Sequence, residues 1–99
     1  MNLVLLFRTT ELAGETGEVC NEAKKLRRFM NGMTGGKDPE TARAALAEEL
    51  ADVIICADRV AEALDIDLSE AVRSKFNATS EKYGLKTMFT HPSDFEEQD

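Results

Sequence analysis

The stretch ELAGETGEVCNE, residues 11–22, contains four glutamates: Glu11, Glu15, Glu18 and Glu22. In a helix of about 3.6 residues per turn, this spacing places all four carboxylates in one stripe. Like charges three or four residues apart on a helix repel one another, at a cost of roughly 0.2–0.5 kcal/mol per pair. The stripe therefore predicts that cations lie against it, either lysine and arginine side chains or metal ions.

The helix that carries this stripe is predicted to run from about Leu3 to Met30. Apolar side chains recur on one face of it at helical spacing; they are Leu12, Val19, Ala23, Leu26 and Met30. The next eight residues, NGMTGGKD, contain three glycines and interrupt the pattern. They predict a loop that joins this helix to the next.

A second helix is predicted to begin at Asp38-Pro39, because aspartate is a good N-cap and proline fits the first helical position. It ends near Asp65. Its broad apolar face comprises Leu46, Leu50, Val53, Ile54, Ala57, Val60, Ala61 and Leu64.

A third helix is predicted to open at Asp67, where Asp67 and Glu70 have the spacing of a capping box. It continues to Tyr83, with Gly84 as the residue that terminates it. Three helices and no strand pattern make the predicted fold class all-α.

The chain has 99 residues and neither a repeat nor an internal linker. Residues 1–90 are therefore predicted to form a single domain, followed by an acidic and flexible tail at 91–99. A domain of this size has a modest core, so the helical bundle is expected to be completed by homo-oligomerisation.

The composition excludes several classes of function. A net charge of −7 argues against binding of a nucleic acid polymer, because such proteins carry a basic surface. No apolar run approaches the roughly 20 residues that span a bilayer, so no membrane role is expected. Cys20 and Cys56 lack C-x-x-C spacing, which favours two reduced, buried thiols in a cytoplasmic protein.

A second pair of carboxylates, Glu49 and Asp52, projects beside the apolar face of the second helix. Two such pairs on two antiparallel helices can face each other. Mg²⁺ takes oxygen ligands and often links a few carboxylates to substrate phosphates, so four carboxylates suit it. The alternative is a solvated acidic face whose charges are paired with lysine and arginine.

The chain lacks the residues that several other catalytic chemistries require. His91 is the one histidine of the chain, whereas a di-iron carboxylate bundle needs two E-x-x-H motifs. The same shortage leaves no Ser-His or Cys-His pair for nucleophilic catalysis. A water activated by a metal ion remains as the route to hydrolysis.

These motifs resemble those of the MazG-like all-α nucleoside triphosphate pyrophosphohydrolases. The segment GETGEVCNEAKKL is similar to the family's first metal-binding helix, and EELADVIICADRVAEALDIDL to its second helix and the following turn. The segment EAVRSKFNATSEKYG is similar to its third helix. The resemblance extends over roughly residues 11–84, most of the chain.

The resemblance implies hydrolysis of a (d)NTP between the α and β phosphates, which gives (d)NMP and pyrophosphate. It implies a Mg²⁺-dependent enzyme, with Mn²⁺ as a substitute, that works as a homodimer or homotetramer. The catalytic metal ligands would be Glu15, Glu18, Glu49 and Asp52. Glu22 and Glu48 are candidate bases behind these ligands, although a salt-bridged surface role is the alternative for both.

Basic residues on the third helix and at the end of the first helix are candidates for phosphate binding. In the family the third helix supplies basic groups to the phosphates, which points to Lys75 and Lys82. Lys25 and Arg28 close the first helix, where cations also interact favourably with the helix dipole. Solubility is the alternative role for the first pair, and capping or salt bridges for the second.

A hypothesis of another class also fits the sequence. The chain could be a non-catalytic helical dimerisation or regulatory module whose acidic face docks a basic protein. An enzyme should bind Mg²⁺ or Mn²⁺ at the carboxylates and release pyrophosphate, whereas a docking module should do neither.

Overall fold

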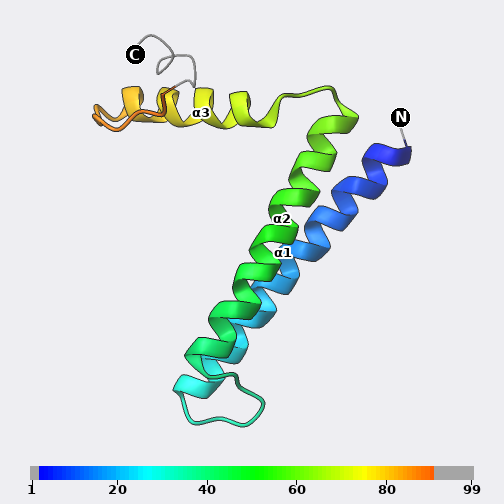
Figure 1. The fold of residues 1–99 in the computed structure, drawn as a ribbon, viewed down its shortest axis with the longest axis vertical. Coiled ribbons are helices and arrows are strands. Elements are labelled where there is room, and N and C mark those ends of the chain that lie inside the picture. The colour runs from blue at the N-terminus through cyan, green and yellow to red at the C-terminus, as the bar shows by residue number, and fades with distance from the viewer. Residues whose placement is uncertain (1–2, 91–99) are drawn as a thin grey trace, which may run out of the picture. The chain divides into compact units, whose positions relative to one another are not determined.

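The computed structural model describes residues 3–90, which form three helices and no strand. Helix α1 spans Leu3–Met30, α2 spans Pro39–Ala63 and α3 spans Leu68–Lys82 (Figure 1). The predicted all-α fold class is confirmed. The predicted acidic tail at residues 91–99 lies outside the described residues.

Helix α2 begins where its cap predicts. Asp38 is the N-cap: one of its carboxylate oxygens accepts a hydrogen bond from the backbone N–H of Thr41 at 3.0 Å. The other accepts from the Thr41 hydroxyl at 2.8 Å. The first of these bonds satisfies a helix N–H group that has no partner within the helix, so Asp38 defines the start of α2.

Helix α3 also has the predicted boundaries. Asp67 accepts a hydrogen bond from the backbone N–H of Glu70 at 3.1 Å. At the other end, Leu85 donates its N–H to the carbonyl of Ser80 and Gly84 donates to that of Glu81. This is the Schellman pattern, and the φ of +66° at Gly84 explains why glycine stands there.

The loop between α1 and α2 folds back onto the last turns of α1. The N–H of Met33 donates to the carbonyl of Arg28 at 2.8 Å, and that of Lys37 to the carbonyl of Lys25 at 3.0 Å. Gly36 approaches the helix so closely that an added Cβ would lie 2.5 Å from the backbone nitrogen of Phe29. The loop is therefore bound to α1 through its backbone.

The chain separates into two compact units. Helices α1 and α2 pack lengthwise as an antiparallel hairpin, which belongs to the first unit, ending at Leu64 (Figure 1). Helix α3 and the residues around it form the second unit. The prediction of a single domain over residues 1–90 stays a prediction.

The hairpin buries few apolar side chains. Among the described residues the buried hydrophobic ones are Ala42 and Ala61, and no large side chain is fully buried. Several apolar residues of both helices are half-buried, namely Leu12, Val19, Leu26, Leu46, Val53, Ala57 and Val60. The hairpin thus covers part of both predicted apolar faces.

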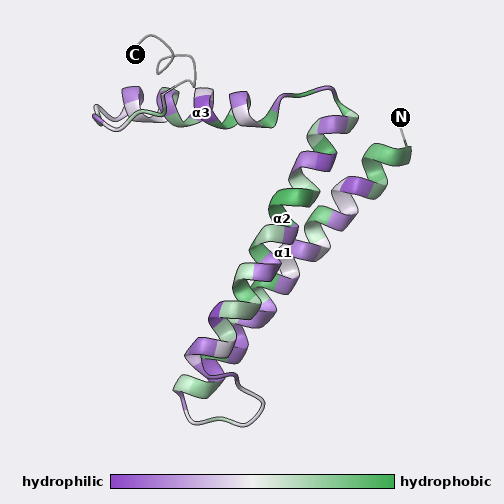
Figure 2. Cartoon of the chain, viewed as in Figure 1, coloured by the Kyte–Doolittle hydropathy of each residue, from purple (hydrophilic) through white to green (hydrophobic). Residues whose placement is uncertain are grey.

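The rest of the α2 apolar surface is open. Leu50, Ile54 and Ile55 are 53%, 65% and 57% exposed. Figure 2 shows hydrophobic residues recurring along the length of α2. We call these three residues the α2 stripe.

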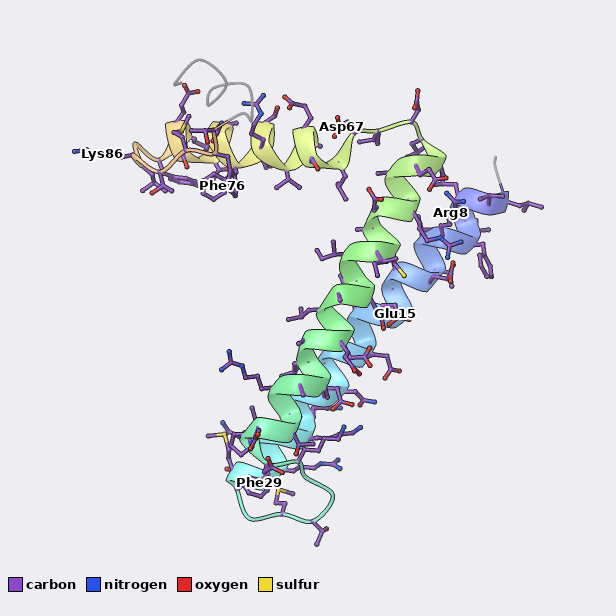
Figure 3. All side chains as sticks on the ribbon, in the orientation of Figure 1. Arg8, Glu15, Phe29, Asp67, Phe76 and Lys86 are labelled. Atoms are coloured by element: carbon purple, nitrogen blue, oxygen red, sulfur yellow. The ribbon has the colours of Figure 1, made fainter. Side chains whose placement is uncertain are left out.

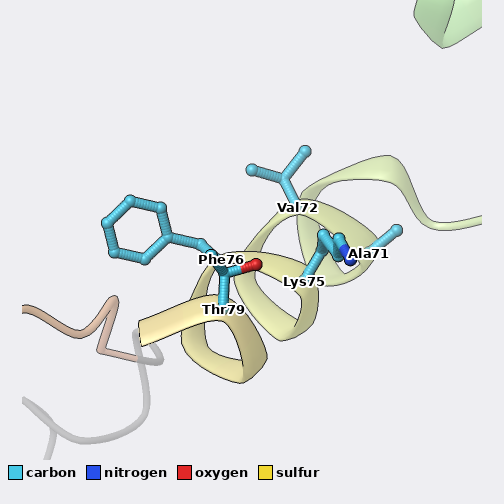
Figure 4. A pocket seen from close by; sticks show the side chains of 5 residues that line it. All are labelled: Ala71, Val72, Lys75, Phe76 and Thr79. Carbon is cyan, nitrogen blue, oxygen red and sulfur yellow. The ribbon is translucent and has the colours of Figure 1, made fainter. Parts of the chain in front are cut away.

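In the second unit, residues 85–90 return along α3. The ring of Phe89 lies 4.4 Å from that of Phe76, centroid to centroid. The Asn77 side chain donates to the carbonyl of Phe89 at 3.1 Å and accepts from its N–H at 2.8 Å. An open pocket on α3 is lined by Ala71, Val72, Lys75, Phe76 and Thr79 (Figure 4).

Within residues 3–90, no helix combines the length and the apolar character that a transmembrane span requires.

Candidate metal centre

Three of the four predicted metal ligands come together between α1 and α2. Glu15 on α1 and Glu49 and Asp52 on α2 each offer a carboxylate oxygen, and these oxygens lie within 4.8 Å of one another. Glu49 and Asp52 share a face of α2 because they are three residues apart. Figure 3 shows Glu15 near the middle of α1, beside α2. We call these three residues the carboxylate triad.

The surroundings of Glu49 disfavour the charged form of its carboxyl group. Partial burial raises the pKa of Glu49, and the negative charges of Glu15, Asp52, Glu18 and Glu22 raise it further. Among residues 3–90 no lysine or arginine forms an ion pair with a member of the triad. The negative charge is therefore concentrated here without a cationic side chain bound to it.

The donor set of the triad fits a hard divalent cation. All three ligands are carboxylates, which Mg²⁺ and Mn²⁺ accept. In an octahedral shell with bonds of about 2.1 Å, opposite oxygens are about 4.2 Å apart and adjacent oxygens about 3.0 Å apart. The triad oxygens lie within 4.8 Å of one another, so side-chain rotations that draw them closer together would bring them into such a shell.

Glu18, the fourth predicted ligand, lies apart from the triad. It is exposed on α1, one turn beyond Glu15. Its charge nevertheless acts on Glu49, so it belongs to the same electrostatic environment. Glu48, a candidate base, is exposed on α2.

Glu22 has a different environment from the triad. Its residue exposure is 7%, and its carboxylate binds Lys25 at 3.1 Å and Lys37 at 2.9 Å. The hydrogen bonds from Lys37 and Lys25 lower the pKa of Glu22. The glutamate stripe of α1 thus meets side-chain cations at Glu22 and further carboxylates at Glu15.

The predicted phosphate-binding residues are distributed over both units. Lys25 is engaged with Glu22, and Arg28 lies against the loop, with Nη1 3.6 Å from the position of a Cβ on Gly35. Lys75 and Lys82 are exposed in the α3 unit, where Lys82 Nζ lies 5.4 Å from the ring centroid of Tyr83. Their role in phosphate binding stays a prediction.

Two residues near the centre were not foreseen from the sequence. Lys37 pairs with Glu22 across 15 positions, and Arg8 donates through Nη1 to the carbonyl oxygen of Arg59 at 2.7 Å across 51 positions. No local pattern indicates contacts of this range. The available signal was the seven-residue spacing of Arg8, Glu15 and Glu22, which places them on one face of α1.

Cys56 does not offer a reactive thiolate. Burial raises the pKa of the Cys56 thiol, and the negative charges of Glu15 and Glu11 raise it further. The thiol therefore stays protonated at neutral pH, when it is a poor nucleophile. Cys56 is half-buried, but Cys20 is exposed, so the predicted burial of Cys20 is wrong. Cys20 lies on α1 away from the half-buried positions of that helix.

The functional interpretation depends on the motifs of the chain and on the geometry of the triad. Comparisons of the chain with known protein families, curated proteins and solved structures found no match.

Proposed function

We propose that the chain is a Mg²⁺-dependent, MazG-like nucleotide pyrophosphohydrolase that converts (d)NTP and water to (d)NMP and pyrophosphate. The observation that carries the proposal is the convergence of Glu15, Glu49 and Asp52 from two helices without a cationic partner among residues 3–90. Concentrated like charge costs stability, and bound metal would offset this cost. The motif resemblance supports the substrate class.

The triad would hold the metal, with Glu18 joining it from the next turn of α1. When bound there, Mg²⁺ would neutralise phosphate oxygens and lower the pKa of a water molecule. In the reaction the water oxygen bonds to the α phosphorus and the bridging α–β P–O bond breaks. Pyrophosphate leaves with the bonding electron pair, and the water proton passes to solvent or a base.

The proposal includes assembly of a helical bundle from identical chains. The α2 stripe is exposed in the hairpin, and a second copy laid against it would complete a four-helix bundle. A homodimer is the smallest such assembly, and a homotetramer is the larger one. A cytoplasmic location also belongs to the proposal, from the cysteine usage of the sequence.

The test is a panel of all (d)NTPs with Mg²⁺, in which monophosphate, diphosphate, pyrophosphate and orthophosphate are resolved. We expect pyrophosphate and the monophosphate in equal amounts. Glu49→Gln and Asp52→Asn should each lower turnover by about 100-fold or more, since each removes a ligand charge. Glu62→Gln is the matched control, because Glu62 is an exposed carboxylate of α2 outside the triad.

Release of orthophosphate with a diphosphate would contradict the proposed bond cleavage. Absence of both turnover and Mn²⁺ binding would favour the non-catalytic module, whose acidic face would include the triad. Binding of Mn²⁺ that is lost in Glu49→Gln but kept in Glu62→Gln would support the metal centre independently of substrate choice.

A further inference from the structure

The packing between α1 and α2 involves large apolar side chains that are half-buried rather than fully buried. Helices usually acquire a fixed register when large side chains of one fit between those of the other. In this hairpin the buried apolar residues are alanines, Ala42 near one end of α2 and Ala61 near the other. No large side chain is fully buried among the described residues, so polar contacts gain importance for the register.

One polar contact lies at the loop end of the hairpin. The carboxylate of Glu22 binds Nζ of Lys37 at 2.9 Å, and the N–H of Lys37 donates to the carbonyl of Lys25. Asp38, the next residue, caps α2. Lys37, which directly precedes the N-cap, is therefore bound to α1 through both its side chain and its backbone. We call this the loop-end contact.

The other polar contact lies at the open end. The Arg8 guanidinium on α1 donates to the carbonyl oxygen of Arg59 on α2 at 2.7 Å. A guanidinium presents its donors in a rigid fork, which makes such a bond directional. Figure 3 shows Arg8 towards the open end of α1 and Phe29 at the loop end, with Glu15 between them. We call this the open-end contact.

The two contacts are evenly placed about the triad. Arg8, Glu15 and Glu22 follow one another at seven-residue intervals, or about 10.5 Å of helix each. A slip of one helical turn would move α1 by about 5.4 Å along α2. That displacement exceeds the 4.8 Å within which the triad oxygens lie. Such a slip would separate Glu15 from Glu49 and Asp52.

We infer that the loop-end and open-end contacts set the register of α1 against α2 and thereby hold Glu15 opposite Glu49 and Asp52. Glu22, Lys37 and Arg8 are then positioning residues. The consequence for metal binding rests on the proposed function, whereas the register itself does not.

The direction in which a substitution changes the Mn²⁺ affinity distinguishes a positioning role from a long-range electrostatic effect. Lys37→Met and Arg8→Met each remove a cation near an acidic site, which by charge alone should tighten Mn²⁺ binding. Loss of register should instead weaken it by about 10-fold or more. Lys24→Met is the matched control, since it removes an exposed cation from α1 outside both contacts, and Lys37→Arg keeps the ion pair.

The register can be measured without metal by electron–electron distance spectroscopy between two spin labels. One label is attached to Cys20, which is exposed on α1, and the other to Glu62→Cys on α2, in a Cys56→Ser background. The two positions are far apart along the hairpin axis, so sliding changes their distance directly. Dilution with unlabelled protein removes distances between chains. Circular dichroism confirms that each variant is helical at the measuring temperature.

We expect Lys37→Met combined with Arg8→Met to shift or broaden the distance distribution by several ångströms, whereas Lys37→Arg and Lys24→Met leave it unchanged. An unchanged distribution in the helical double variant would overturn the inference, as would tighter Mn²⁺ binding. A shifted distribution in a protein that binds no Mn²⁺ would support the register and reject the proposed metal centre. If the double variant loses its helical structure but the single variants Lys37→Met and Arg8→Met keep theirs, the two single variants are compared with wild type instead. The same criteria then apply to them.

Discussion

Glu49 is the residue at which partial burial and acidic neighbours act together on a single carboxyl group. Its pKa is raised above the ordinary value, so its contribution to stability is fully present below that value and is lost as pH rises through the raised pKa. At neutral pH without metal, Glu49→Gln should therefore raise the thermal midpoint by roughly 1–3 °C. Thermal unfolding in EDTA, followed by circular dichroism, measures this.

The control for this substitution is Glu62→Gln on the same helix, which should leave the midpoint nearly unchanged. Added Mn²⁺ should then reverse the order, stabilising the wild-type chain more than Glu49→Gln because the substitution removes a ligand. A lower midpoint for Glu49→Gln in EDTA would show that the triad is not a site of net repulsion.

Glu22 should influence stability in the opposite direction from Glu49. Its lowered pKa means that its contribution is present above the ordinary value of 4.5 and is lost as pH falls through the lowered pKa. Glu22→Gln should be less stable than wild type at pH 7, and its midpoint should fall less steeply below about pH 4.5. Thermal midpoints between pH 3 and pH 7 give both curves.

Asp38 also makes the thermal midpoint depend on pH in this experiment, because hydrogen bonds from Thr41 lower its pKa as well. The Glu22→Gln curve should therefore be shallower than that of wild type but not flat. Parallel curves for the two proteins would contradict the ion pairs of Glu22 with Lys25 and Lys37.

At the scale of elements, two glycines should respond to substitution in opposite directions. A Cβ at Gly36 would lie 2.5 Å from the Phe29 backbone nitrogen, so Gly36→Ala must displace the loop from α1. A Cβ at Gly14, inside α1, meets nothing within 4 Å, and alanine is the better helix former. We expect Gly36→Ala to lower the thermal midpoint and Gly14→Ala to raise it, each by about 4 °C or more.

The two measurements are made on chains of equal length and charge, so each controls for the other. If Gly36→Ala leaves the midpoint unchanged, the loop does not pack on α1 as described. A destabilising Gly14→Ala would show that another chain approaches that face of α1.

The helix boundaries were predictable because their causes are local. Asp38-Pro39, Asp67 and Gly84 each act within a few residues of the end that they define, so the sequence pattern was sufficient. The loop-end contact was not predictable, because it depends on the path of the loop and on the approach of Gly36. The sequence indicated which helices carry the carboxylate triad, since Glu49 and Asp52 must share a face of α2.

The finer geometry of the centre could not be read from spacing. Glu15 and Glu18 are equivalent in an E-x-x-E pattern, and the rotation of α1 about its own axis decides which one meets α2. In the same way, the pattern of α2 shows a broad apolar face, but the packing of α1 decides that Val53 is half-buried and Ile54 exposed.

For the whole molecule, the exposed α2 stripe predicts self-association. Burial of apolar area contributes about 25 cal/mol per Å², so pairing two such stripes should be favourable. We expect sedimentation equilibrium at micromolar concentration to give at least twice the chain mass of 10.9 kDa. Ile54→Glu should reduce this mass, because it places a charge in the proposed interface.

Met33→Glu is the control, since Met33 is an exposed apolar residue of the loop outside the α2 stripe. Its mass should match that of the wild-type chain. A folded and active wild-type monomer would contradict the proposed assembly.

The burial of alanines rather than large side chains also has a consequence for folding. A hairpin with so small an interior gains little from closing alone, so the chain should reach its folded state together with a partner copy. Folding and association then form one second-order reaction. Its refolding rate should increase with protein concentration, and its thermal midpoint should rise by mass action when the protein is concentrated from micromolar to millimolar.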